Sequence, residues 1–298
     1  MTQNGHYEGA SIPAGKLAGD GRNILSVEKL TIAFDGFTVL DNLDFSIGYG
    51  EMRFLIGPNG AGKTTLLDVI TGKSKANDGS VTFDGDLDLS RHSEHGVVKL
   101  GIGRKFQTPS VYNSLTIFQN LEASARFRNR IIGLFRPMSR AIIQRIQETL
   151  ELIGLTDRQE QNAGVLSHGE RQWLEIGMLL VQEPKLLLLD EPVAGMTRRE
   201  RDRTGRLLQD IARDRSVLVV EHDMDFVRQF AQIVTVLHQG KVLSEGTMDI
   251  VQQDPQVVRA YLGRSRGRTG AATAGEGTPP ALGVSTATTG ETPHLTGG

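Results

Sequence analysis

Apolar and polar residues alternate in the first patterned part of the chain, in the stretches ILSVEKLTIAF, FTVLDNLDFSI and GSVTFDG. Alternation with a period of two, between Gly and Asp breaks, predicts half-buried antiparallel strands. Three other runs, RFLIG, KLLLLD and SVLVVEHD, are continuously apolar instead. Such runs are typical of parallel strands that helices cover on both faces. We therefore predict an α/β domain with a mixed sheet and an N-terminal antiparallel β region.

Between Asn113 and Glu183 the strand patterns give way to apolar residues spaced three and four apart. The stretches TIFQNLEASARF, AIIQRIQETLELIG and RQWLEIGMLLVQ carry this spacing. It predicts amphipathic helices. We expect a helical subdomain, at about residues 108–183, inserted into a domain that spans residues 24–263.

The two ends of the chain lack such patterns. Residues 1–23 are Gly-rich and polar, without the apolar stretch of a signal peptide. Residues 264–298 hold almost no large apolar side chain, so they would bury too little surface to offset the entropy of ordering. We expect a flexible N-terminal segment and a disordered C-terminal tail. An arginine cluster in that tail would either be solvated or touch acidic headgroups: Arg264, Arg266 and Arg268.

Composition narrows the classes of partner. The 298 residues include 33 basic and 35 acidic ones, which gives a net charge of -2. The chain as a whole therefore has no positive field that would attract nucleic acid. The lack of cysteine excludes disulfides and thiolate metal sites. No apolar run approaches the ~18 residues of a membrane helix. We expect a protein that is soluble and intracellular, or that is bound to a membrane only through another protein.

The stretch GPNGAGKTT follows the apolar RFLI and precedes the helical LLDVI, which is the context of a phosphate-binding P-loop. Gly60 and Gly62 let successive backbone N–H groups turn inward at the positive end of a helix. Lys63 would neutralise phosphate charge, and Thr64 would offer its hydroxyl to Mg²⁺. We expect nine residues to bind a nucleoside triphosphate, taken to be ATP: Gly57, Pro58, Asn59, Gly60, Ala61, Gly62, Lys63, Thr64 and Thr65.

Two later apolar runs end in groups suited to hydrolysis. Asp190 follows four leucines and should emerge at the carboxyl end of a buried strand, where it can hold Mg²⁺. Glu191 can orient or deprotonate the attacking water, and we expect apolar surroundings for it. His222 ends the next apolar run, so it should reach the same sheet edge and point toward the γ-phosphate.

The segment LSHGE precedes the helical RQWLEIGMLL and is open to three interpretations: a small hydrolytic group, a helix cap, or half of a phosphate site that a second chain completes. Ser167 and His168 are chain neighbours at a helix start, where adjacent side chains diverge, which disfavours a nucleophile and its base. The S-x-x-E spacing predicts a capping box, in which Ser167 and Glu170 each accept from the other's backbone N–H. A capped helix start also attracts anions, so the last two interpretations are compatible.

In order and spacing these motifs resemble those of the nucleotide-binding subunits of ABC transporters, over about residues 24–263. GPNGAGKTT resembles the Walker A motif, KLLLLDEP the Walker B motif with its catalytic glutamate, and LSHGE the signature motif. The resemblance implies an ABC ATPase with a P-loop NTPase fold. It implies that Gln107 contacts Mg²⁺ or the attacking water, that His222 is the switch histidine and that Phe34 stacks on adenine. Five residues would contact the ATP of a partner subunit: Leu166, Ser167, His168, Gly169 and Glu170.

The resemblance also implies partners. These are a second ATPase subunit, identical or different, and transmembrane permease subunits, whose short helix would lie near TPSVYNSLTIFQN. An extracytoplasmic solute-binding protein would act indirectly, and nucleic acid is not expected. The chain would be peripheral on the cytoplasmic face of the plasma membrane and would couple ATP hydrolysis to solute uptake.

More narrowly, GPNGAGKTTLLDVITGK and LEIGMLLVQEPKLLLLDEPVAGMT resemble the ATPases of branched-chain amino-acid and urea importers. LSHG with RQWLEIGMLL, and EPVAGMT, look most like a urea-transport ATPase, so urea is the expected solute and branched-chain amino acids are the alternative. Three further alternatives are a lipid or lipopolysaccharide-export ATPase, a soluble ATPase of translation or repair, and a P-loop kinase. The soluble class usually carries two cassettes, and a kinase would leave LSHGE unexplained.

Two segments depart from the family pattern. His168 replaces the first paired glycine of L-S-G-G-Q, and Glu170 replaces the glutamine. Position 168 therefore need not adopt a backbone conformation reserved for glycine. Thr197 stands where the family's D-loop usually ends in aspartate, which puts in doubt a role for a carboxylate there.

Overall fold

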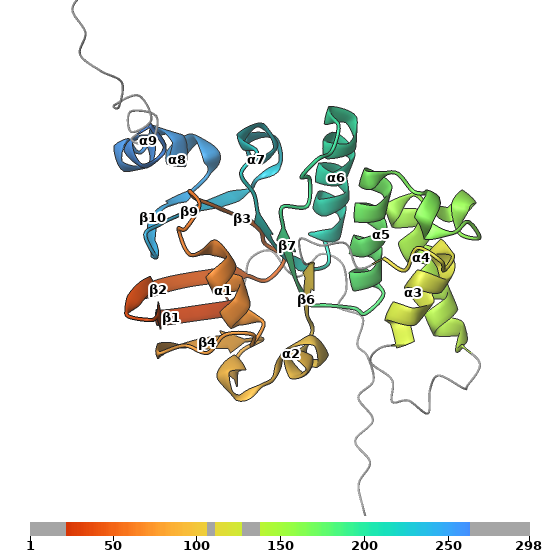
Figure 1. Ribbon diagram of the computed structural model, residues 1–298, viewed down its shortest axis with the longest axis horizontal. Helices are drawn as coiled ribbons and strands as arrows, with labels where there is room; N and C mark the ends of the chain where they lie inside the picture. The colour runs from red at the N-terminus through yellow and green to blue at the C-terminus, as the bar shows by residue number, and fades with distance from the viewer. Residues whose placement is uncertain (1–21, 106–110, 127–137, 263–298) are drawn as a thin grey trace, which may run out of the picture. The chain divides into compact units, whose positions relative to one another are not determined.

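The structure is a computed structural model that describes residues 22–105, 111–126 and 138–262. It contains two sheets (Figure 1). The smaller sheet has the strand order β2-β1-β4-β5: Phe37–Gly48, Asn23–Phe34, Asp78–Phe83 and Leu87–Asp88. The larger sheet has the order β10-β9-β3-β8-β7-β6: Lys241–Gly246, Ile233–His238, Met52–Ile56, Ser216–Val220, Leu186–Asp190 and Ile102–Lys105.

The pairing of the strands follows their burial patterns. Strands β1, β2 and β4 pair antiparallel, and their residues alternate between buried and exposed. Strands β3, β7 and β8 are buried at every residue and pair parallel. The larger sheet is mixed because β10 joins β9 antiparallel. Both predicted strand types are confirmed, but the antiparallel strands form a sheet of their own, because they bury one face where the parallel strands bury two.

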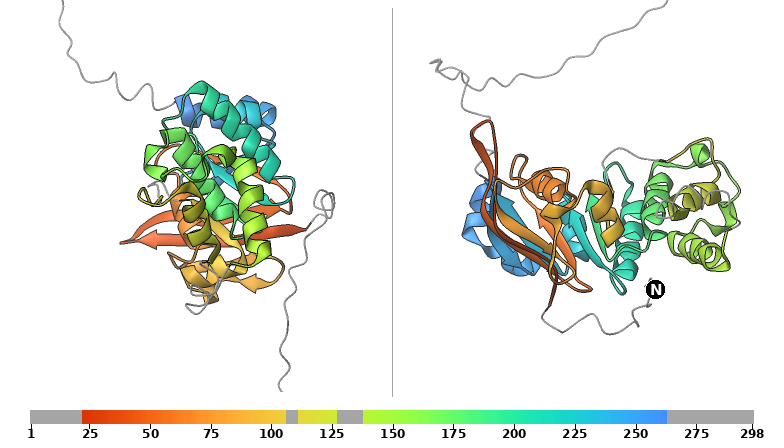
Figure 2. Two further views of the ribbon diagram at one scale, coloured as in Figure 1. Left: turned by 90° about the vertical axis from the view of Figure 1, so that its right-hand side faces the viewer. Right: turned by 90° about the horizontal axis from the view of Figure 1, so that it is seen from below.

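Helices pack against the larger sheet and beside it (Figures 1 and 2). Three of them, α3, α4 and α5, lie where the sequence predicted helices between Asn113 and Glu183: Ile117–Arg126, Arg140–Ile153 and His168–Leu180. The other helices are α1, α2, α6, α7, α8 and α9: Lys63–Ile70, Glu94–Leu100, Arg198–Ile211, Met224–Phe230, Met248–Gln253 and Pro255–Leu262. No helix in the described part of the chain is long and apolar enough to cross a membrane.

The core is divided between two hydrophobic clusters. One cluster joins one face of the larger sheet to α3, α4, α5, α6 and α7. The other lies between the two sheets and around α1. Helix α5 is buried on several sides, and Gly177 lets α4 approach it, since a Cβ there would lie 2.9 Å from Ile153 Cδ1. The helical insertion is thus packed firmly onto the sheet that carries the P-loop.

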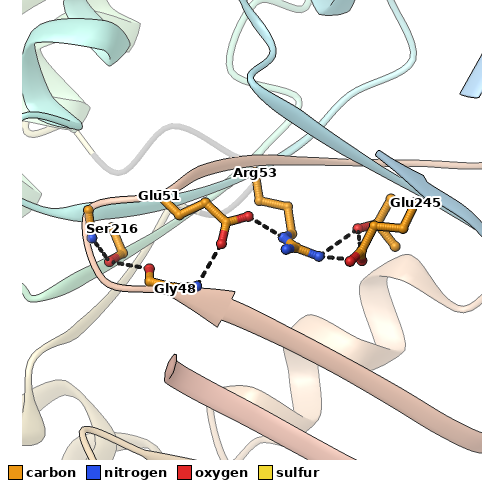
Figure 3. A network of polar contacts seen from close by, with 7 residues as sticks. Gly48, Glu51, Arg53, Ser216 and Glu245 are labelled. Carbon is orange, nitrogen blue, oxygen red and sulfur yellow. Dashed lines mark hydrogen bonds and ion pairs between the residues drawn. The ribbon is translucent and has the colours of Figure 1, made fainter. Parts of the chain in front are cut away.

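A partly buried ionic network joins the two sheets at the amino ends of β3 and β8 (Figure 3). Arg53 forms ion pairs with Glu51 and with Glu245 on β10. Glu51 also accepts the Gly48 N–H at 2.6 Å, and the Ser216 hydroxyl donates to the Gly48 carbonyl at 3.0 Å. Strands β2, β3, β8 and β10 are therefore tied together at the sheet end opposite to the P-loop.

Candidate functional site

Three segments with polar groups meet at the carboxyl edge of the larger sheet. The P-loop follows β3, Asp190 ends β7, and His222 lies two residues beyond β8. Because β3, β8 and β7 are adjacent and parallel, their carboxyl ends share one edge. There, His222 Nδ1 lies 3.4 Å from Glu191 Oε1. The structure thus brings the P-loop to the same edge as Asp190, Glu191 and His222, which lie more than 100 positions later in the chain.

The P-loop is shaped to hold an anion. Lys63 begins α1, and its ammonium donates to the carbonyls of Gly57 at 2.7 Å and Pro58 at 3.2 Å. Gly62 caps α1 with φ of 105°, and a Cβ there would lie 2.5 Å from Leu40 Cδ2 on β2. Glycine offers no side chain to accept from the first N–H groups of α1, so a phosphate can accept from them.

Asp190 lies deep in the site, with 4% of its surface exposed. Burial raises the pKa of its carboxyl, and the neighbouring Glu191 raises it further. Three nearby cations oppose that rise: Arg104, Lys105 and Lys63. The fold places Lys63, at the start of the helix that follows β3, and Asp190, at the end of β7, at the same edge of the larger sheet, and their charges are of opposite sign.

The side chain of Glu191 is more exposed to solvent than the sequence led us to expect. Its side chain is 37% exposed, so the expected apolar surroundings are wrong. The reason is its position just beyond the buried strand, at the start of a turn that leaves the sheet. Its φ of 48° is rare for a residue with a side chain, and its N–H donates to Val220 O at 2.9 Å. Such strain is often kept where a side chain must be aimed.

Sequence reasoning missed the two cations at the end of β6. Arg104 Nη1 lies 2.5 Å from Asp68 on α1, and Arg104 Nη2 lies 4.0 Å from Asp190. Lys105 Nζ lies 3.6 Å from Glu175 on α5, and both side chains are buried. The sequence carried no clear signal for these cations, because β6 is the four-residue strand IGRK, which has no long apolar run to mark it as buried.

The described part of the chain holds a cavity of about 600 Å³ next to Lys105, between α2, β6, α3 and α5. Its lining is mostly apolar, and includes Val98, Tyr112 and Met178. Gln107 belongs to residues 106–110, outside the described residues. The predicted contact of Gln107 with Mg²⁺ or water therefore stays a prediction.

The LSHGE segment forms the predicted capping box at the start of α5. Ser167 Oγ accepts the Glu170 N–H at 3.3 Å, and Glu170 Oε2 accepts the Ser167 N–H at 2.9 Å. Burial tends to raise the pKa of Glu170, but the Ser167 N–H and an ion pair with Arg158 lower it overall. His168 Nε2 lies 3.0 Å from Ala194 O instead of facing Ser167. A hydrolytic Ser–His pair is therefore excluded.

Thr197, which stands in place of the usual aspartate of the D-loop, caps a helix in this structure. It caps α6 in a second capping box, in which its hydroxyl accepts the Glu200 N–H at 3.4 Å and Glu200 accepts the Thr197 N–H at 2.9 Å. The two capped helix starts are neighbours, because a Cβ on Gly169 would lie 2.4 Å from Glu200 Oε1. The T-x-x-E pattern of TRRE was the signal for this cap.

Phe34 ends β1 and is 50% exposed, opposite Phe37 in the strand register. The P-loop itself meets β2 near Leu40, because Gly62 lies against that side chain. Phe34 therefore has an accessible ring on the strand pair next to the P-loop, and its stacking on adenine stays a prediction.

Comparison with known proteins identifies the family. The family described as ABC transporter matches residues 40–194, and the family described as branched-chain amino acid ATP-binding cassette transporter matches residues 241–266. The branched-chain amino acid transport ATP-binding protein BraF of Pseudomonas aeruginosa is 31% identical, over 82% of this chain and 99% of that protein. LivG of Escherichia coli, named for the same transport, is 32% identical, over 81% of this chain and 98% of that protein.

Solved structures agree with this result. The ABC transporter cassette MJ1267 in its ADP conformation is 30% identical, with a TM-score of 0.72, over 81% of this chain and 99% of that one. A dimeric post-hydrolysis cassette, MJ0796 bound to ADP and phosphate, is 25% identical, with a TM-score of 0.63, over 75% and 98% of the two chains. The chain therefore belongs to the ABC transporter family, as an ATP-hydrolysing subunit of the branched-chain amino acid importer type.

Proposed function

We propose that ATP is hydrolysed at the edge where β3, β7 and β8 end. The observation that carries this proposal is the 3.4 Å separation of His222 Nδ1 and Glu191 Oε1, beside the P-loop. Glu191 would take a proton from the attacking water, and His222 would orient Glu191 and contact the γ-phosphate. Lys63 would neutralise charge on the β- and γ-phosphates.

Mg²⁺ fits the oxygens at this edge. Asp190 presents a buried carboxylate and Thr64 a hydroxyl on the first turn of α1. The described residues contain no cluster of three or more metal-binding side chains, so nucleotide phosphates would have to complete the shell. Mg²⁺ usually binds in this way, through one or two protein oxygens and phosphates. When bound, it neutralises charge on the transferred phosphoryl group.

The segment LSHGE would act on the nucleotide of a second ATPase subunit. The Ser167 hydroxyl accepts from the Glu170 N–H, so its own proton remains to donate to a phosphate oxygen. The Glu170 carboxylate is turned onto the Ser167 N–H and Arg158. A negative charge at this position is therefore compatible with a bound anion nearby.

We propose that a membrane permease docks at the cavity next to Lys105. The cavity is mostly apolar and is bordered by α2, β6, α3 and α5. The buried Lys105–Glu175 ion pair links this cavity to α5, whose start carries Ser167. Movement of a permease helix docked in this cavity would thus be transmitted through α5 to the segment LSHGE. The chain would then lie peripherally at the cytoplasmic face of the membrane.

We propose branched-chain amino acids as the solutes of the importer. The relatives BraF and LivG are named for the transport of these amino acids, and this chain matches them over nearly their full length. Urea is a second candidate, which rests only on the resemblance of LSHG and EPVAGMT to urea-transport ATPases. The relatives reported above are not named for urea.

The test uses the whole transporter, purified with its permeases and solute-binding protein and placed in liposomes. ATP turnover should rise with leucine, isoleucine or valine if the first proposal is right, and with urea if the second is right. Binding protein without solute is the control. Turnover that neither solute class changes would contradict both assignments.

A further inference from the structure

Glu221 is a buried acidic residue that the proposed reaction does not use. It lies between β8 and His222, and 1% of its surface is exposed. A carboxylate is seldom buried so deeply unless donors surround it. The hydrogen-bond donors around Glu221 therefore indicate the role of its carboxylate.

The donors to Glu221 come from two separate segments. Oε1 accepts the N–H of Val193 at 3.2 Å, from the turn that begins at Glu191. Oε2 accepts the N–H of His222 at 3.1 Å, and a longer contact of 3.5 Å joins it to the N–H of Asp223. One carboxylate thus bridges the two segments that carry the proposed base and its histidine partner.

We propose that Glu221 is a positioning residue for ATP hydrolysis, which holds Glu191 and His222 at their working separation. The inference rests on the proposed function, since it assigns to Glu221 a role through those two residues. It follows from the geometry because both side chains extend from turns whose backbone is fixed to the same carboxylate.

The bridge requires a group that only accepts hydrogen bonds. An ionised carboxylate has about four acceptor positions and no donor, whereas an amide would turn an NH₂ group toward one of the two segments. Burial raises the pKa of Glu221, while the N–H groups of Val193, His222 and Asp223 oppose the rise. The positive charge of Lys105 is also close enough to interact with Glu221.

The test compares Glu221→Gln with wild type in the full-length chain. We expect kcat for ATP to fall about tenfold or more, because the base and its partner separate by a fraction of an ångström to an ångström. The KM for ATP should stay within about twofold, because the P-loop binds the nucleotide from another segment. In crystals, the separation of His222 Nδ1 and Glu191 Oε1 should increase.

Glu51→Gln is the matched control. Glu51 is also a largely buried carboxylate that accepts a backbone N–H (Figure 3). It comes just before β3, whereas Glu221 follows the parallel strand β8, so the two residues lie at opposite ends of the sheet. The Glu51→Gln variant should have a lower thermal stability than wild type but an unchanged kcat. An equal fall in kcat for Glu51→Gln would overturn the proposal, as would wild-type kcat in Glu221→Gln.

Glu221→Asp keeps the experiment decisive if Glu221→Gln does not fold. Its shorter side chain can still accept from its chain neighbours but should not reach Val193, so kcat should fall with KM unchanged. Wild-type kcat in this variant would contradict the bridge. Failure of the proposed function would give a different result, because Glu191→Gln would then hydrolyse ATP at the wild-type rate.

Discussion

His168 Nε2 lies 3.0 Å from the carbonyl oxygen of Ala194, so the first residue of α5 contacts the segment that follows Glu191. The ring also packs against Gly195, where a Cβ would lie 3.3 Å from Nε2. The His168 side chain therefore joins the start of α5, which is proposed to face the partner's nucleotide, to the segment after Glu191, which is proposed to face the subunit's own nucleotide.

Replacing His168 should loosen that segment. In His168→Gly, we expect backbone amides of residues 192–197 to exchange about fivefold faster, as loss of a hydrogen bond of about 1 kcal/mol implies. His168→Gln should restore most of the protection, because its amide can reach the Ala194 carbonyl. Hydrogen exchange read by mass spectrometry tests both variants, and unchanged exchange in His168→Gly would show that the contact does not hold the segment.

Glu191→Gln should separate ATP binding from hydrolysis. The amide keeps the size of the side chain but cannot accept a proton, so we expect turnover to fall at least about 100-fold. ATP binding and ATP-dependent dimerisation should persist, because Lys63 and the P-loop are intact. Glu151→Gln, an exposed change on α4, is the control. Wild-type turnover in Glu191→Gln would remove Glu191 as the base.

Glu170→Gln should be mild by comparison. Glutamine can complete a capping box, so the bond from the Ser167 N–H is kept. The ion pair with Arg158 is lost, and partly exposed pairs contribute little, at most about 1 kcal/mol. We expect ATP turnover within about threefold of wild type. A loss as large as that of Glu191→Gln would give Glu170 a direct part in hydrolysis.

Arg53→Met should destabilise the fold without affecting the site. The change leaves Glu51 and Glu245 close together without their cation. Breaking a fully buried ion pair costs about 3 kcal/mol or more in free energy of unfolding. Because the Glu245 side chain is 42% exposed, we expect a smaller loss here, of about 1–2 kcal/mol. Urea denaturation of the full chain measures the loss. The control is Arg91→Met, which removes an ion pair whose arginine side chain is 81% exposed and should change stability little.

Tyr49 should make stability sensitive to alkali. Its hydroxyl donates to Asp84 at 2.6 Å, and burial, followed by that hydrogen bond, raises the pKa of Tyr49 from 10.0 to about 12. Because the folded state favours the protonated phenol, its stabilising contribution is complete below pH 10 and is lost as the pH rises toward 12.

A spectrophotometric titration tests this prediction. One of the four tyrosines should ionise late in wild type, and that late phase should be missing in Tyr49→Phe. Stability should then fall less steeply between pH 10 and 12 in the variant. Tyr112→Phe, which removes a ring that is 58% exposed, is the control and should keep the late phase.

Much of this protein follows from short-range sequence pattern. The capping box at Ser167 and Glu170 was predictable because its partners are three residues apart and bond through local geometry. The P-loop and the buried strand ending in Asp190 were predictable for the same reason, since one strand, one turn and one helix start define each. Thr197 and Glu200 carried an equally local signal.

Only the tertiary structure decided which distant side chains share the site. Lys105 and Glu175 are 70 positions apart, and His168 and Ala194 lie on different helix–turn units, so no local spacing links them. The exposure of Glu191 and the bridging role of Glu221 depend likewise on how three strand ends pack side by side. The sequence by itself determined the elements and the chemical groups at their ends, because those depend on neighbours along the chain. The tertiary packing decided which groups meet, since burying the apolar faces of the strands and helices sets the distances between them.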